Sequence, residues 1–205
     1  MVFLAVVIML LHRQPHQPLV RLAGVAIASL ISLSMVQPSS AQPLCDTGEA
    51  YEPAATTQRT VDLPQFGLTI QIPSNYRTWQ RQDGTVEILH PQTYDFVRCV
   101  AAGGLGGRGY YAESIREVAR DRQRSLYQSA LDLGGAGSTV EPYTSEWFSG
   151  YLVQSDIGYH VAFVFARPER PNDFLVVAAT CDCQIEVEAV TDLIAQMAWR
   201  SQPRF

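Results

Sequence analysis

The chain has 205 residues, of which 47% are hydrophobic and 17% charged, as expected of one globular domain with an appended segment. Its formal net charge is −5, and residues 1–41 contain two arginines and no acid, so the remainder is more acidic still. This charge disfavours nucleic acid and anionic lipid as partners.

An N-terminal leader is predicted over residues 1–41. The apolar run Leu22–Val36 follows Arg21. Small residues then stand at Ser39 and Ala41, and this order is that of a secretory signal cleaved after Ala41. The run is shorter than the roughly 20 residues that a membrane-spanning helix requires. We therefore expect export to a periplasm, a thylakoid lumen or the extracellular space, with a mature form that is soluble.

A second apolar run, Val2–Leu11, precedes the basic residue of this leader. A secretory signal normally begins with its positive charge. Two alternatives therefore stay open. Either residues 1 to about 18 come from an over-long gene start, or the leader is an uncleaved anchor.

Residues 42–62 are rich in proline, threonine and alanine and have little periodicity, so a flexible N-terminal extension is expected. A single α+β domain is predicted over residues 63–205. Tyr76 and Trp79 are expected in a loop after its first strand, as candidates for contact with a partner. The first three strands, joined as an antiparallel meander, are predicted at Leu68–Ile72, Val86–His90 and Tyr94–Ala102.

A glycine-rich stretch follows at residues 103–109. Gly104, Gly106 and Gly109 match the G-x-G-x-x-G spacing of dinucleotide-binding turns. That function also needs a strand ending in an acid about 20 residues further on, and the chain is expected to be helical there. We therefore predict a crossover loop without a cofactor, in which Arg108 could contact a partner protein.

The next segment, Tyr110–Leu133, has apolar residues at helical spacing and is predicted to form one long helix. Arg116, Arg120 and Arg124 would then form a stripe along it, each with an acid three residues before it. A solvated charged face is the ordinary explanation of such a stripe. The alternative is a surface that binds an acidic partner.

Two apolar strands dominate the remainder, at Tyr159–Arg167 and Phe174–Cys181. Both alternating sets of side chains are largely apolar in the first of them, so the hairpin is expected in the middle of a sheet that is covered on both faces. Further strands are predicted at Ser138–Trp147 and Tyr151–Ile157. A closing helix is predicted through Val187 and Met197.

The exported part has four cysteines, at positions 45, 99, 181 and 183, and an even number suggests disulfides. Cys181 and Cys183 would point to opposite faces of a strand, so they are not expected to pair with each other. Cys99 would then bond to one of them and Cys45 to the other. Free buried thiols and a redox or metal Cys-x-Cys site are the alternatives.

This order of elements resembles the PsbP-like family, named for the extrinsic subunit of photosystem II. The likeness is carried by a strand that ends in Ile72-Pro73 and is followed by Trp79, by the helix start at residues 111–115, and by the final hairpin and helix. It would cover residues 63–205. The resemblance implies an α/β/α sandwich around a mainly antiparallel sheet, no enzymatic activity, and a role in assembly with partners in a thylakoid lumen or periplasm.

Three functions follow as hypotheses. The first is an exported, non-enzymatic accessory or protein-binding domain that assists a membrane complex. The second is a carrier of a small apolar ligand in a groove beneath a helix. The third is a hydrolase, whose residues would be His90 or His160 with Asp95, Asp156 or Glu87, but no nucleophile-elbow sequence supports it.

Overall fold

The computed structural model describes residues 42–45, 52–107, 110–167 and 169–200. The predicted leader and Arg108 lie outside these ranges. In chain order the elements are β1 (Gln58–Leu63), β2 (Leu68–Pro73), β3 (Arg77–Gln80), β4 (Val86–Leu89), α1 (Pro91–Ala101), β5 (Ala112–Ala119), α2 (Leu126–Gly134), β6 (Thr139–Thr144), β7 (Ser149–Gln154), β8 (His160–Arg167), β9 (Arg170–Thr180), α3 (Glu188–Ala195) and β10 (Met197–Trp199).

A seven-stranded antiparallel sheet forms the centre of the domain, in the order β3-β4-β5-β9-β8-β7-β6. The hairpin β8–β9 lies inside this sheet, as its apolar pattern predicts. Alternate residues of β8 pack on opposite sides, with Phe163 in one core and Val164 in the other. A strand that is apolar on both faces is stable only where both faces are covered, which explains its central position.

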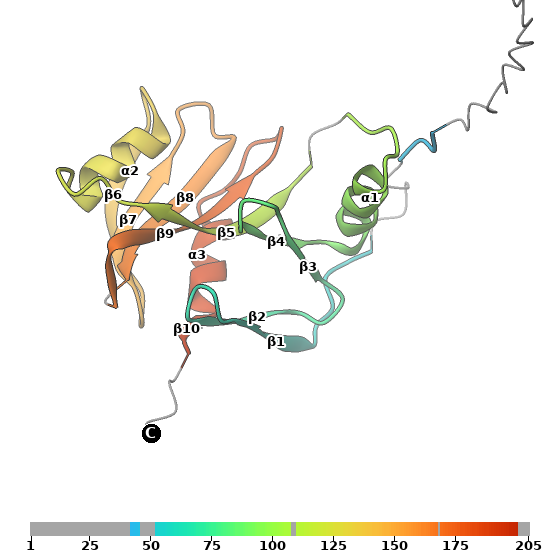
Figure 1. The fold of residues 1–205 in the computed structure, drawn as a ribbon, viewed down its shortest axis with the longest axis horizontal. Coiled ribbons are helices and arrows are strands. Elements are labelled where there is room, and N and C mark those ends of the chain that lie inside the picture. Colours follow the sequence, from blue (N-terminus) through green and yellow to red (C-terminus); the bar gives the residue numbers. More distant parts are fainter. Residues whose placement is uncertain (1–41, 46–51, 108–109, 168, 201–205) are drawn as a thin grey trace, which may run out of the picture. The chain divides into compact units, whose positions relative to one another are not determined.

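Helices cover the two faces of this sheet (Figure 1). Ala130 of α2 packs in the core on one face. Val190 and Ile194 of α3 pack in the core on the other face, together with side chains of the three-stranded sheet β1-β2-β10. The predicted α+β class and the α/β/α arrangement around a mainly antiparallel sheet are confirmed.

The strand predicted at Tyr94–Ala102 is instead helix α1. Pro91 occupies the first turn of the helix, where its missing N–H costs nothing. Phe96 and Val97 are the buried residues of α1, and they pack with Leu89 of β4 in a third cluster. A helix on the end of the sheet therefore replaces the third strand of the predicted meander.

The prediction of a single long helix at Tyr110–Leu133 is also wrong. Its first part is strand β5, which pairs with β9 along its whole length, and only its last part is helix α2. Ile115 is fully buried opposite Val177, so the strand buries apolar surface in the centre of the sheet. This burial outweighs the good helix propensity of the segment, because propensity differences are only tenths of a kcal/mol per residue.

Three short elements were not predicted. Strand β1 pairs with β2 from Gln58 to Leu63, so the expectation of a flexible extension is wrong for residues 58–62. Strand β3 contains Trp79, which was expected in a loop. Strand β10 follows α3 and pairs with β2. Strands β1 and β3 each pair with the next strand in the chain, and β10 pairs with a strand far away in the chain. All three are short and have no strong local pattern of their own.

Candidate functional site

The four cysteines form two disulfides, Cys45–Cys99 and Cys181–Cys183. The predicted pairing of Cys99 and Cys45 with the two C-terminal cysteines is therefore wrong. Strand β9 ends at Thr180, and the chain bends through Cys181 to Cys183, so their side chains are not held on opposite faces. Their Cα atoms are 5.2 Å apart, well within the range that a disulfide spans.

The Cys45–Cys99 disulfide lies in a packed environment. Cys45 is 7% exposed and belongs to the cluster that α1 forms with the sheet. The glycine-rich loop packs directly against it, because a β-carbon at Gly104 would collide with both sulfur atoms, and one at Gly106 would collide with Phe96. Close packing thus explains two of the three glycines of the G-x-G-x-x-G match.

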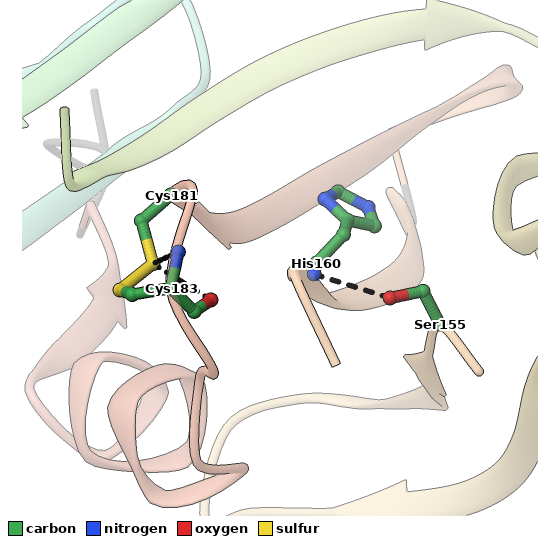
Figure 2. The surroundings of a disulfide bond; sticks show 4 residues. All are labelled: Ser155, His160, Cys181 and Cys183. Carbon is green, nitrogen blue, oxygen red and sulfur yellow. Dashed lines mark hydrogen bonds between the residues drawn. A yellow bond between two sulfur atoms is a disulfide. The ribbon is translucent and has the colours of Figure 1, made fainter. Parts of the chain in front are cut away.

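The Cys181–Cys183 disulfide lies in a different setting, at the end of β9 (Figure 2). Cys183 is exposed and Cys181 is half-buried against the core beneath α3. The backbone N–H of Cys183 donates a hydrogen bond to Cys181 Sγ at 3.0 Å. We call this region, residues 155–160 and 180–185, the cystine end of the sheet.

Two large apolar side chains are exposed at the cystine end. Ile157 is 64% exposed and Tyr159 is 48% exposed, both in the turn between β7 and β8. This turn is attached to the segment after the disulfide, because Ile185 N donates to Gly158 O at 2.8 Å. The acids Asp156 and Asp182 are exposed in these two segments, and Glu186, which directly follows the second segment, is exposed as well. The cystine end therefore combines apolar surface, negative charge and an accessible disulfide.

His160 begins β8 at the same end, and its backbone N–H donates to Ser155 Oγ at 3.2 Å (Figure 2). Burial and the charge of Arg116 lower the pKa of the imidazole below its ordinary value. The ring points away from the disulfide in Figure 2. The lowered pKa favours the neutral form of His160 at neutral pH. Because its ring points away from the disulfide (Figure 2), His160 is not placed to exchange a proton with the sulfur atoms.

The predicted arginine stripe is not formed. Arg116 lies in β5, whereas Arg120 and Arg124 follow it in the loop before α2. Arg120 Nε donates to Arg124 O at 3.1 Å, and Arg124 forms ion pairs with Asp121 and Asp132. The structure does not bring these three side chains to one row, and their contact with a partner stays a prediction.

Tyr76 and Trp79 are half-buried and packed against neighbours. Tyr76 contacts His90 edge to face with ring centroids 5.5 Å apart, and Trp79 contacts Tyr94 in the same way at 5.9 Å. Each ring also borders a hydrophobic core. Both aromatic residues thus serve packing within the domain, and their role as a partner contact likewise stays a prediction.

Two of the carboxylates named for a hydrolase, Glu87 and Asp95, form ion pairs with arginines. Glu87 forms an ion pair with Arg81 at 2.8 Å, and Asp95 forms one with Arg98 at 3.1 Å. Within the described residues no group of three metal-ligating side chains is found.

A hollow of about 440 Å³ opens between α2 and the edge of β5 and β9. Val118, Leu133 and Phe174 provide an apolar floor, while Arg124 and its acidic partners stand among the lining residues. Its size is in the usual range of small-molecule sites. It corresponds in place to the groove beneath a helix that the carrier hypothesis requires.

The half-buried carboxyl of Glu113 lies on β5. Tyr111 Oη donates to Glu113 Oε1 at 2.8 Å. Burial raises the pKa of Glu113, and the charge of Asp192 adds to this shift. The pair is a second place where the pKa values of ionisable groups are shifted.

Comparison with known proteins adds little. No family model and no curated protein sequence matches the chain. Among solved structures, the Ran-binding protein Mog1p of Saccharomyces cerevisiae is similar at 8% identity and a TM-score of 0.43, over 70% of this chain and 96% of that chain. We draw no functional conclusion from this likeness. In the described part of the chain, no helix is long and apolar enough to span a membrane.

Proposed function

We propose that this domain is a non-enzymatic protein-binding module that works after export, as an accessory of a membrane complex. The observation that carries the proposal is the pair of exposed apolar side chains, Ile157 and Tyr159, at the cystine end. Scattered apolar residues are common on protein surfaces, but two that share one turn form a contact patch. Because exposed acids flank this patch, its partner is a protein segment with apolar and basic side chains.

Export is supported by the cysteines. Both disulfides involve the described domain, and disulfides persist in oxidising compartments outside the cytosol. N-terminal sequencing of the protein purified from its own cells tests this part of the proposal. We expect the mature chain to begin at Gln42, and a chain that retains the leader would contradict cleavage after Ala41.

Site-specific photocrosslinking tests the contact patch. A photoreactive phenylalanine analogue is placed at Tyr159 and, as a control, at Trp147, which is 53% exposed and lies at the other end of β7. We expect the Tyr159 probe to crosslink one protein of the membrane fraction and the Trp147 probe to leave it unlabelled. Ile157→Ser should remove the crosslink. Equal labelling from both positions would contradict a specific contact at the cystine end.

The hollow beside α2 favours a second candidate, a carrier of a small ligand. Native mass spectrometry of the protein from its own cells would then show a bound small molecule. Ala119→Trp would fill the hollow from its exposed rim and should abolish that mass increment, whereas Ala136→Trp, on an exposed turn that does not line the hollow, should preserve it. A protein without any increment would contradict the carrier function.

A further inference from the structure

The cystine end holds a disulfide whose accessibility differs between its two sulfurs. Cys183 is exposed, whereas Cys181 is half-buried and borders the core beneath α3. Thiol–disulfide exchange requires a thiolate to reach one sulfur along the line of the S–S bond. The exposed side of this bond is the Cys183 side, so an external thiolate meets Cys183 Sγ first.

The hydrogen bonding favours the same direction of attack. When Cys183 Sγ is attacked, Cys181 Sγ must leave as a thiolate. The backbone N–H of Cys183 already points at this sulfur at 3.0 Å. An N–H donor stabilises a thiolate more than a neutral sulfur, so this contact favours Cys181 Sγ as the leaving group. The carbonyl oxygen of Cys183 lies 2.9 Å from the same sulfur and can accept a hydrogen bond from it once the sulfur is protonated.

Opening this disulfide leaves the surrounding fold in place. The bond joins two residues that are two positions apart, after the last residue of β9. Backbone bonds on either side hold the segment without it, because Cys181 N donates to Tyr159 O and Ile185 N donates to Gly158 O. Reduction therefore needs no unfolding. The Cys45–Cys99 bond differs, because Cys45 is buried and Cys99 half-buried in a packed cluster, and we expect its reduction to require local opening of that cluster.

We propose that Cys181–Cys183 is a thiol–disulfide exchange site that accepts two electrons from the dithiol of another protein in the same compartment. The first partner thiolate attacks Cys183 Sγ, a mixed disulfide forms, and the Cys181–Cys183 bond breaks with Cys181 as the leaving thiolate. The second partner thiol then attacks its own neighbouring sulfur, forms the partner's disulfide and releases Cys183. The two protons of the partner dithiol end on Cys181 and Cys183, so atoms and electrons balance.

Exchange goes beyond the proposed binding function, because a small thiol can react here without the contact at Ile157 and Tyr159. The same two side chains would nevertheless guide a protein dithiol to the site, since they lie on the turn that is hydrogen-bonded to the disulfide segment. Their loss would slow exchange with a protein but not with glutathione.

The test uses the mature, fully oxidised protein and glutathione as the probe. Samples are quenched with acid at intervals and alkylated, and peptide mass spectrometry identifies which sulfur carries glutathione. We expect the first adduct on Cys183, with Cys181 alkylated, at a rate at least ten times that of any change at Cys45 or Cys99. An adduct that forms first on Cys181, or equal rates at the two disulfides, would overturn the proposal.

Two single variants provide a matched control. Cys181→Ser leaves Cys183 as a free thiol, and Cys183→Ser leaves Cys181. Both thiols are measured at about pH 10, above the ordinary cysteine pKa of about 8.5, so that each is a thiolate and its rate reports its accessibility. We expect the thiol of Cys181→Ser to react with a disulfide reagent at least ten times faster than that of Cys183→Ser. Both variants keep Cys45–Cys99 and should fold, which circular dichroism checks. The reverse order of reactivity would contradict the assignment of Cys183 as the attacked sulfur. Failure of the photocrosslinking experiment would leave these rates unaffected, so the two proposals fail separately.

Discussion

Cys45–Cys99 joins residues 54 positions apart inside a packed cluster, whereas Cys181–Cys183 joins residues two positions apart on an exposed bend. In the first region Gly104 packs so closely on the disulfide that a β-carbon at this position would collide with both sulfur atoms. In the second region the flanking side chains are exposed. A disulfide therefore stabilises the fold in one place and offers chemistry in the other.

Removal of each disulfide measures this difference most directly. A disulfide removes more conformational entropy from the unfolded chain when the loop it closes is longer. Cys45→Ala with Cys99→Ala should therefore lower the free energy of unfolding by about 4 kcal/mol. Cys181→Ala with Cys183→Ala should lower it by no more than about 1.5 kcal/mol. Urea denaturation of both double variants checks the ratio. Similar losses would show that the two bonds have the same structural role.

A buried ion pair allows the comparison to be extended to the other end of the β8–β9 hairpin. The side chain of Arg167 is 6% exposed and bonds to Glu117 at 2.7 Å, while Arg170, 54% exposed, bonds to the same carboxylate. Glu117→Ala leaves a buried charge unpaired and should cost about 3 kcal/mol. Arg170→Ala, the control, should cost less than about 1 kcal/mol. Neither variant should change the rate at which glutathione attacks Cys183; a faster attack would mean that cystine reactivity follows global stability.

Two glycines give a smaller, local contrast. A β-carbon at Gly104 would collide with Cys45 Sγ and Cys99 Sγ, so Gly104→Ala should destabilise the protein by about 3 kcal/mol through overpacking. Gly158 at the cystine end has φ of +72°, but its β-carbon would meet only Gln184 Cγ at 3.5 Å. Gly158→Ala should therefore cost only the left-handed backbone penalty of about 1 kcal/mol. Thermal unfolding of both variants decides whether packing is tighter around Cys45–Cys99.

The smallest expected effect is a pH dependence at the cystine end. The pKa of His160 is lowered in the folded protein by burial and by Arg116, so the unfolded chain binds the proton more readily. The free energy of unfolding should then fall as the pH drops below about 6.5, the ordinary histidine pKa. In His160→Gln this part of the dependence should be absent, and chemical denaturation of both proteins between pH 7.5 and pH 5 checks it. Parallel curves would contradict a depressed pKa.

The sequence predicts the parts of this fold whose information is local. Both alternating sets of side chains in residues 159–167 are largely apolar. This pattern alone predicts a hairpin in the middle of the sheet with both of its faces covered. The segment 112–119 is different, because Ile115 and Val118 also fit helical spacing. Its strand conformation comes from pairing with β9, more than 50 residues away in the chain, and no local window contains that partner.

The cysteine pairing illustrates the same limit at the candidate site. The prediction that Cys181 and Cys183 cannot pair assumes that the strand continues through both residues. The strand ends at Thr180, and this end depends on where its neighbours β5 and β8 stop pairing. The exposure of Ile157 and Tyr159 was not predicted either, since apolar residues beside a strand are normally assigned to the core. The even number of cysteines was the feature of the sequence that indicated disulfides, but it did not indicate which cysteines pair.

The central claim is that the two disulfides differ in function, and an equilibrium redox titration tests it in a single sample. The mature protein is equilibrated in dithiothreitol buffers of increasing reducing strength, the thiols are alkylated, and the four cysteine peptides are quantified by mass spectrometry. We predict two separate transitions, with Cys181 and Cys183 reduced together in weakly reducing buffer while Cys45 and Cys99 stay oxidised. A single transition for all four cysteines, or earlier reduction of Cys45–Cys99, would contradict the account.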